Sequence, residues 1–138
     1  MQIEERIKIK ATPEQIFTIY ENVSEWSSWD PDVQSSSIDG KFKAGAKGKL
    51  KPTKGPEAKI DFTEVTRNKS FTTTSKLPLC TMSFEHELAS TSEGTEVTHK
   101  VAFSGLLSPV FGRLIGRGIK KGLPATMLGL RNAAESKS

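Results

Sequence analysis

A single long helical segment must cover seven predicted strands in this chain. Residues 108–135 fit that helix, because their apolar side chains recur at near-helical intervals. These side chains are Val110, Phe111, Leu114, Ile115, Ile119, Leu123, Met127 and Leu130. Pro109 falls in the first turn, and Pro124 is expected to kink the helix. A seven-stranded sheet packed on one helix must curl around that helix, because otherwise part of its concave face stays exposed to water. The sequence therefore predicts a curved sheet and an apolar cavity between sheet and helix.

Six strand candidates follow one another through the middle of the chain. Short segments rich in Gly, Pro, Asn and Asp separate them, and these residues favour turns. The predicted ranges are 33–39, 46–52, 57–66, 69–77, 80–90 and 94–104. A seventh strand is predicted over 3–10, where Ile3, Ile7 and Ile9 fall on one face.

Two short helices are predicted between the first strand and the others. Thr12 suits an N-cap, and Gln15, three residues later, completes a capping box. We expect one helix from Pro13 to Glu21 and a second, shorter one from Val23 to Trp26. The predicted fold class is thus α+β, with a curved seven-stranded antiparallel sheet around a long C-terminal helix.

Length and composition limit the classes of protein to which the chain can belong. Its 138 residues suit one domain spanning 1–138, and 35% hydrophobic with 26% charged residues is typical of a globular chain. No run reaches the roughly 18 apolar residues of a membrane span, and the first residues lack a secretory signal. The single Cys80 excludes an internal disulfide and a Cys-rich metal site. We expect a cytoplasmic protein without a cofactor, either a monomer or a homodimer.

Positive charge gathers in the later part of the chain. Residues 1–39 carry three bases and eight acids, whereas residues 40–138 carry seventeen bases and eight acids. The bases cluster at Lys41, Lys43, Lys47, Lys49, Lys51 and Lys54, and again at Arg113, Arg117, Lys120, Lys121 and Arg131. These clusters are solvated surfaces or sites of weak contact with an anionic membrane. Phe42 is the one aromatic residue among them, so nucleic-acid binding is not predicted.

Two histidines are predicted to face each other on the inner side of the sheet. A four-residue loop over 91–94 sets a register that places His86 directly opposite His99. Among Met, Phe and Val side chains, the pair would orient a ligand or move a proton, or it is a structural pair in the core. Glu5 is a weak candidate for a third metal ligand, so no metal site is predicted.

One conflict remains open in the register of the neighbouring strands. A turn at Arg67-Asn68 pairs Phe62 with Thr73 and places the charged Glu64 on the inner face. A bulge near Val65 would restore the apolar pattern. Both arrangements are compatible with the sequence.

Residues from both the sheet and the long helix would line the cavity. The predicted apolar wall is Leu50, Phe62, Phe71, Met82, Phe84, Val101, Phe103, Leu123 and Met127. The polar groups that would orient a ligand are Thr73, Ser75, His86 and His99. Trp26, Trp29 and Phe42 either rim the mouth of the cavity or pack as core under the short helices.

The chain resembles the polyketide cyclase/dehydrase branch of the START-like (SRPBCC) superfamily over nearly its whole length. The resemblance rests on segments 11–17, 26–33, 45–50, 94–98 and 114–117 in that order. It implies a helix-grip fold with a deep hydrophobic cavity. The superfamily includes lipid carriers, hormone receptors, quinone-binding proteins and aromatase/cyclases, so it constrains the ligand only loosely.

Three functions are compatible with these observations. The first is binding or carriage of a small or medium hydrophobic ligand (a lipid, a polyketide-like or an aromatic molecule). The second is a cyclase or dehydratase in which His86 or His99 moves a proton, although no catalytic motif assigns that role. The third is a lipid carrier at the membrane surface, suggested by the bases of the C-terminal helix.

Overall fold

Seven strands form one antiparallel sheet in the computed structural model, which describes residues 2–137. The strands are β1 (Gln2–Ile9), β2 (Val33–Asp39), β3 (Lys47–Pro52), β4 (Ala58–Thr66), β5 (Ser70–Leu77), β6 (Cys80–Thr91) and β7 (Gly94–Ser104). Their order in the sheet is β1-β7-β6-β5-β4-β3-β2, so that only the pairing of β1 with β7 joins distant parts of the chain. The predicted strands and the α+β fold class are confirmed.

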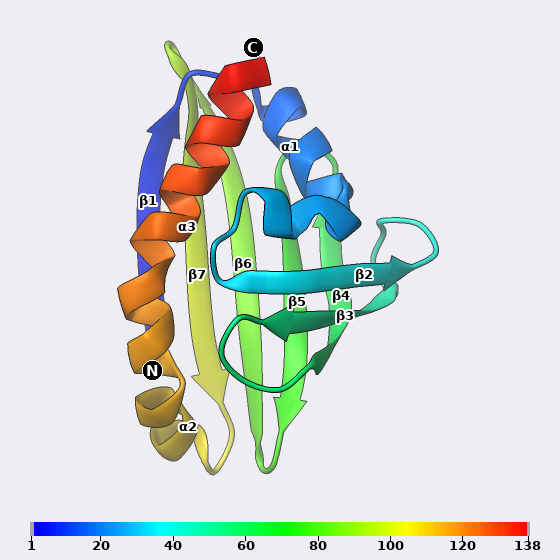
Figure 1. Ribbon diagram of the computed structural model, residues 1–138, viewed down its shortest axis with the longest axis vertical. Helices are drawn as coiled ribbons and strands as arrows, with labels where there is room; N and C mark the ends of the chain where they lie inside the picture. The colour runs from blue at the N-terminus through cyan, green and yellow to red at the C-terminus, as the bar shows by residue number, and fades with distance from the viewer. Residues whose placement is uncertain (1, 138) are drawn as a thin grey trace.

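The sheet curls around the C-terminal part of the chain. Strands β4 to β7 run along the long axis of the molecule, whereas β2 and β3 cross in front of them (Figure 1). The predicted curvature is therefore present, and it gives the sheet an inner face and an outer face.

The helices lie on the inner side of this sheet. They are α1 (Pro13–Glu21), the 3₁₀ helix η1 (Val23–Ser28), α2 (Ser108–Leu114) and α3 (Gly116–Lys137). The capping box of α1 is confirmed, because Gln15 N donates to Thr12 Oγ1 at 3.1 Å and Thr12 N donates to Gln15 Oε1 at 2.9 Å.

The expected single C-terminal helix is divided in two. The interruption lies at Ile115, not at Pro124, which is inside α3. Two buried glycines, Gly112 and Gly116, flank Ile115, and glycine has a low helix propensity. The prediction of one helix was therefore wrong in this detail, and α2 is a separate short helix at one end of the molecule (Figure 1).

The register of the inner strands agrees with the sequence prediction. His86 lies opposite His99, and Phe84 lies opposite Val101. The open conflict on β4 is resolved by an irregularity between Phe62 and Glu64, which places Val65 opposite Phe71. The bulge alternative is thus confirmed.

Two groups of apolar side chains fill the space inside the curved sheet. The larger group, called the aromatic cluster here, includes Phe17, Tyr20, Trp26, Phe42, Phe62 and Phe71. The second group gathers toward the α2 end and includes Ile3, Cys80, Val101, Phe103 and Leu123. Among residues 2–137, none of the helices combines the length and apolar character needed to cross a lipid bilayer.

Candidate functional site

A row of side chains crosses the inner face of four neighbouring strands. Glu5 on β1 lies opposite His99 on β7, which lies opposite His86 on β6, which lies opposite Phe71 on β5. Cross-strand partners in such pairs project from the same face of a sheet. The sheet therefore brings the two histidines together, and their ring centroids are 4.5 Å apart.

Helix α1 adds a polar partner to this row. The hydroxyl of Tyr20, a fully buried residue, lies 2.8 Å from Nε2 of His99. The other ring nitrogen of His99, Nδ1, is buried and makes no hydrogen bond within residues 2–137. The same holds for Nε1 of Trp29, whose ring centroid is 6.2 Å from that of Tyr20.

His86 is held between two aromatic rings. Its ring is nearly parallel to that of Phe71, with centroids 3.9 Å apart, and to that of Phe84, with centroids 4.6 Å apart. Its Nδ1 lies 3.2 Å from the carbonyl oxygen of Phe71. A carbonyl oxygen only accepts, so Nδ1 of His86 carries the proton and donates it.

Both histidines are neutral at physiological pH. Burial lowers the pKa of His99 to about 3. Burial, and to a smaller extent the neighbouring His99, lowers the pKa of His86 well below its usual value. Burial also raises the pKa of the Tyr20 phenol well above its usual value, so its hydroxyl keeps its proton.

An apolar surface lies beside the histidines toward α2. It consists of partly buried side chains that pack against the second core group, and we call it the apolar groove. Its members are Leu77, Met82, Phe84, Leu107, Phe111, Ile115 and Ile119. Phe84 connects the groove to the site, because its ring stacks on His86 and meets the edge of His99 with centroids 5.7 Å apart.

The partial exposure of Met82 and Phe84 shows where the inner face is open. Each stands between two inner-face neighbours that are buried: Met82 between Ser75 and Phe103, and Phe84 between Thr73 and Val101. Side chains flanked in this way keep part of their surface accessible where the concave side of the sheet is incompletely covered.

The predicted lining residues divide between this site and the aromatic cluster. Met82, Phe84, Val101, Phe103 and Leu123 belong to the groove or to the core beneath it, on the side of the histidines. Phe62, Phe71, Trp26 and Met127 are buried in the other core group, against which Trp29, Phe42 and Leu50 pack. Thr73 and Ser75 are buried on β5.

Sequence reasoning missed several residues of the site. It did not single out Tyr20, and it did not assign Phe111, Ile115 or Ile119 to the wall. A buried tyrosine usually finds a hydrogen-bond partner for its hydroxyl, and this was the signal for Tyr20. The position of α2 over the sheet had no counterpart in the sequence pattern.

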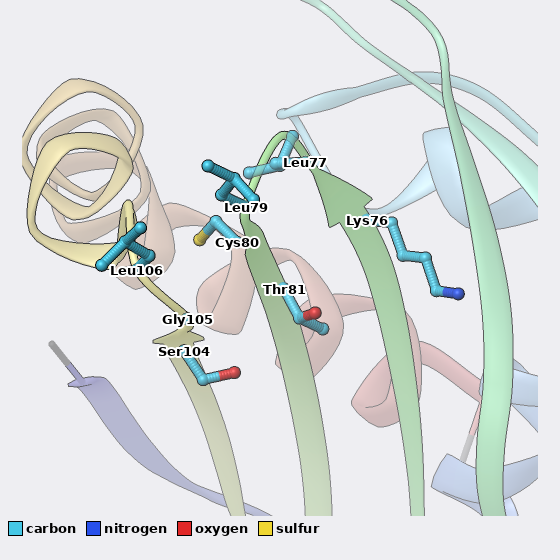
Figure 2. A pocket seen from close by; sticks show the side chains of 8 residues that line it. All are labelled: Lys76, Leu77, Leu79, Cys80, Thr81, Ser104, Gly105 and Leu106. Carbon is cyan, nitrogen blue, oxygen red and sulfur yellow. The ribbon is translucent and has the colours of Figure 1, made fainter.

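Two surface pockets lie away from the histidines. One, of about 380 Å³, lies at the β5–β6 turn and the segment after β7, where Leu79 and Leu106 stand close to α2 (Figure 2). The other, of about 470 Å³, lies at the opposite end, between the β6–β7 turn and the end of α3. Neither is the internal cavity that the sequence predicts, and neither includes a residue of the apolar groove except Leu77.

The loop over 29–32 fixes α3 against the rest of the site. Asp30 Oδ1 accepts hydrogen bonds from the hydroxyl of Thr126 at 2.9 Å and from the backbone of Asp32 at 3.0 Å. A Cβ atom at Gly129 would overlap the carbonyl oxygen of Trp29, and one at Gly122 would overlap the carboxylate of Asp32. The glycines therefore allow the loop to lie directly on the helix.

Within the described residues, no three His, Cys, Asp or Glu side chains form a group suited to a metal ion.

Comparisons with known proteins agree with this fold. Three solved structures are similar over almost their entire length. The protein MLL2253 from Mesorhizobium loti is 20% identical, with a TM-score of 0.78 over 100% of this chain and 99% of that one. A START superfamily protein from Mycobacterium smegmatis is 13% identical, with a TM-score of 0.76 over 99% of both chains. The Aha1 dimer from Colwellia psychrerythraea is 20% identical, with a TM-score of 0.71 over 98% and 96%.

A family model supplies the assignment that these structures alone do not give. No curated protein matches the chain. The model described as polyketide cyclase / dehydrase and lipid transport matches residues 1–135, which confirms the resemblance inferred from the sequence. The chain therefore belongs to the polyketide cyclase/dehydrase and lipid transport family and has its START-like helix-grip fold.

Proposed function

We propose that the protein binds a small or medium hydrophobic ligand in the apolar groove, with His86 and His99 at the inner end. The observation that carries this proposal is the accessibility of Met82 and Phe84 on the concave face of the sheet. Covering such a surface releases about 25 cal/mol for each Å² of apolar area removed from water. The family description, which includes lipid transport, supports the same class of ligand.

Binding without proton transfer fits the site better than catalysis does. A general base works best when its pKa lies near the operating pH. Burial lowers the pKa of His99 to about 3, so this ring is a weak base at neutral pH. The cyclase or dehydratase alternative would need ligand binding to raise that pKa by several units.

A matched pair of variants on β6 tests the location. Met82→Glu places a charge in the apolar groove, whereas Ser83→Glu places the same charge on the opposite face of the same strand, at similar exposure. Naphthalene serves as the probe, and its affinity is measured by equilibrium dialysis. We expect Met82→Glu to weaken binding roughly tenfold or more, since a buried unpaired charge is costly, and Ser83→Glu to leave it unchanged. Equal affinities for all three proteins would contradict the proposed location.

One further feature favours contact with an anionic membrane surface at the α2 end. Four large apolar side chains are exposed there: Leu79 (65%), Leu106 (79%), Val110 (49%) and Leu114 (74%). Leu79 adopts φ 52°, a left-handed conformation that glycine or asparagine occupies at lower cost. Four basic residues lie near Val110 and Leu114 in the sequence: Arg113, Arg117, Lys120 and Lys121. No acidic residue occurs from 97 to 134. Exposed leucines beside a run of positively charged residues suit the surface of an anionic bilayer.

Vesicle flotation tests this contact. The wild-type protein should float with phosphatidylglycerol-containing vesicles and not with pure phosphatidylcholine. The double variant Leu106→Glu/Leu114→Glu should lose flotation, while Leu128→Glu, which alters an exposed leucine elsewhere on α3, should keep it. If the double variant changed the oligomeric state and left flotation intact, the exposed leucines would be a protein interface instead.

A further inference from the structure

Tyr20 and His99 together carry more hydrogen-bond donors than the structure uses. The phenol has one O–H, and a neutral imidazole has one N–H. A single hydrogen bond joins the two residues, between the hydroxyl and Nε2. One proton can lie in that bond, so one donor of this buried pair is left without an acceptor. Tyr20 and His99 expose 0% and 1% of their surfaces, which makes an unpaired donor costly.

The cost of the alternatives decides where the unpaired proton lies. If Nε2 of His99 donates to the tyrosine oxygen, the phenol proton and the lone pair on Nδ1 are both left unpaired. If the phenol donates to Nε2, only the Nδ1–H group is unpaired. The second arrangement leaves fewer groups unsatisfied, so Nδ1 of His99 is a buried, unoccupied donor.

His86 offers the complementary group. Its Nδ1 donates to the Phe71 carbonyl oxygen, so Nε2 of this neutral ring holds a lone pair. No side chain or backbone group within residues 2–137 donates to that nitrogen. The histidine pair therefore combines one free donor, on His99, with one free acceptor, on His86.

We propose that the two histidines recognise a neutral hydroxyl group on the hydrophobic ligand. Its oxygen accepts from Nδ1–H of His99, and its proton is donated to Nε2 of His86. The ring centroids are 4.5 Å apart, so the free donor and the free acceptor are on adjacent rings. The inference rests on the proposed function, because the ligand must first enter the apolar groove beside Phe84.

A charged ligand headgroup fits this position poorly. A carboxylate has no proton for Nε2 of His86. No Lys or Arg projects from the inner face of β5, β6 or β7 near the histidines, and Glu5 lies directly opposite His99 on the neighbouring strand. An anion would enter an apolar site without a cation to neutralise it. The site should thus select alcohols or phenols over carboxylic acids of the same skeleton.

Four probes with one skeleton test this selectivity on the wild-type protein at pH 7. Naphthalene has no polar group, 2-methoxynaphthalene only accepts, 2-naphthol accepts and donates, and 2-naphthoate is charged. We expect 2-naphthol to bind roughly tenfold more tightly than naphthalene, 2-methoxynaphthalene to fall between them, and 2-naphthoate to bind most weakly. Equilibrium dialysis gives all four affinities under one condition.

Two variants separate the roles of the rings. His86→Phe should abolish the advantage of 2-naphthol over 2-methoxynaphthalene and keep the advantage of 2-methoxynaphthalene over naphthalene. His99→Phe should abolish the advantage of 2-methoxynaphthalene over naphthalene. Nitrogen-15 chemical shifts of the wild-type rings provide a readout independent of folding in the variants, and both rings should carry their proton on Nδ1.

The outcomes distinguish this inference from the proposed function. If naphthalene and 2-naphthol bind equally well, the hydroxyl proposal is overturned and the apolar site stands. Equal binding is the result expected if a bound water molecule already forms hydrogen bonds with both histidines. A proton on Nε2 of either ring also overturns the hydroxyl proposal. If none of the neutral probes binds, the proposed function itself is overturned.

Discussion

Two neutral histidines in an aromatic environment define the site at the scale of single residues. His86 stacks between Phe71 and Phe84, and His99 is fixed by Tyr20. Stacked and edge-on rings hold both imidazoles in place without any charged partner. The geometry therefore suits recognition of a neutral polar group better than transfer of a proton.

The lowered pKa values predict a loss of stability in mild acid. Each histidine takes up a proton in the unfolded chain near pH 6.5, whereas folded His99 does so only at about 3. The unfolded state therefore binds more protons between these values, and the free energy of unfolding falls as the pH falls through this window. At pH 5 the expected loss from His99 is about 2 kcal/mol relative to pH 7.5, and His86 should add a loss of the same sign.

Urea denaturation at several pH values between 5 and 7.5 measures this effect. For both His99→Phe and His86→Phe, the free energy of unfolding should depend less steeply on pH than it does for the wild-type protein. Burial raises the pKa of Asp30, which acts in the opposite sense as the pH falls, so each slope is compared with the wild-type slope. A histidine variant with the wild-type slope would contradict burial of a neutral imidazole at that position.

The histidine pair could be predicted from the sequence because loop length alone determines its register. The predicted loop over 91–94 is shorter in the structure, because Thr91 pairs with Gly94, but the register is unchanged. The turn therefore fixes which residues of β6 and β7 are opposite, and strand alternation gives the face. The Tyr20 hydroxyl could not be predicted in the same way. Its bond to His99 joins residues 79 positions apart and depends on how α1 docks on the sheet.

At the scale of elements, α3 has a surface shaped for the loop over 29–32. Gly122 and Gly129 each lie about one turn from Thr126, on either side of it, and the Thr126 hydroxyl donates to Asp30. Side chains at these glycines would separate the loop from the helix. The cost of glycine to helix stability is thus offset by a close contact that holds one wall of the site.

Glycine substitutions along α3 should therefore have opposite effects. Gly129→Ala forces Cβ against the Trp29 backbone, and we expect it to lower the free energy of unfolding by about 1–3 kcal/mol. Gly118→Ala meets nothing within 4 Å and should raise it by up to about 1 kcal/mol, because alanine is the better helix former. Thermal or urea denaturation measures both, and destabilisation by Gly118→Ala as large as that by Gly129→Ala would contradict the close docking.

The sequence predicted the strands and α1 better than the C-terminal helix. Alternating apolar residues and a capping box are local signals, and they located these elements to within one residue. The interruption at Ile115 lacked such a signal, since Pro124 was the stronger helix breaker in the pattern. Gly112 and Gly116 are buried, and their burial depends on tertiary packing that a local pattern does not show.

At the scale of the whole molecule, the curved sheet encloses two unlike regions. One region is filled by aromatic rings that contact one another. The ring centroid of Phe42 lies 5.4 Å from that of Phe62 and 5.2 Å from that of Phe71. The other, toward α2, leaves Met82 and Phe84 accessible. The element order predicted the curvature, but which part of the interior stays open depends on the side chains that fill the rest.

The bound position of an apolar probe tests the central claim most directly. Intermolecular nuclear Overhauser effects between naphthalene and the labelled wild-type protein would locate the ligand. We predict contacts to Met82, Phe84 and Phe111, with no contacts to Phe62 inside the aromatic cluster. Contacts confined to the surface pocket at Thr81 and Ser104, or the absence of any bound population, would contradict a ligand site on the concave face.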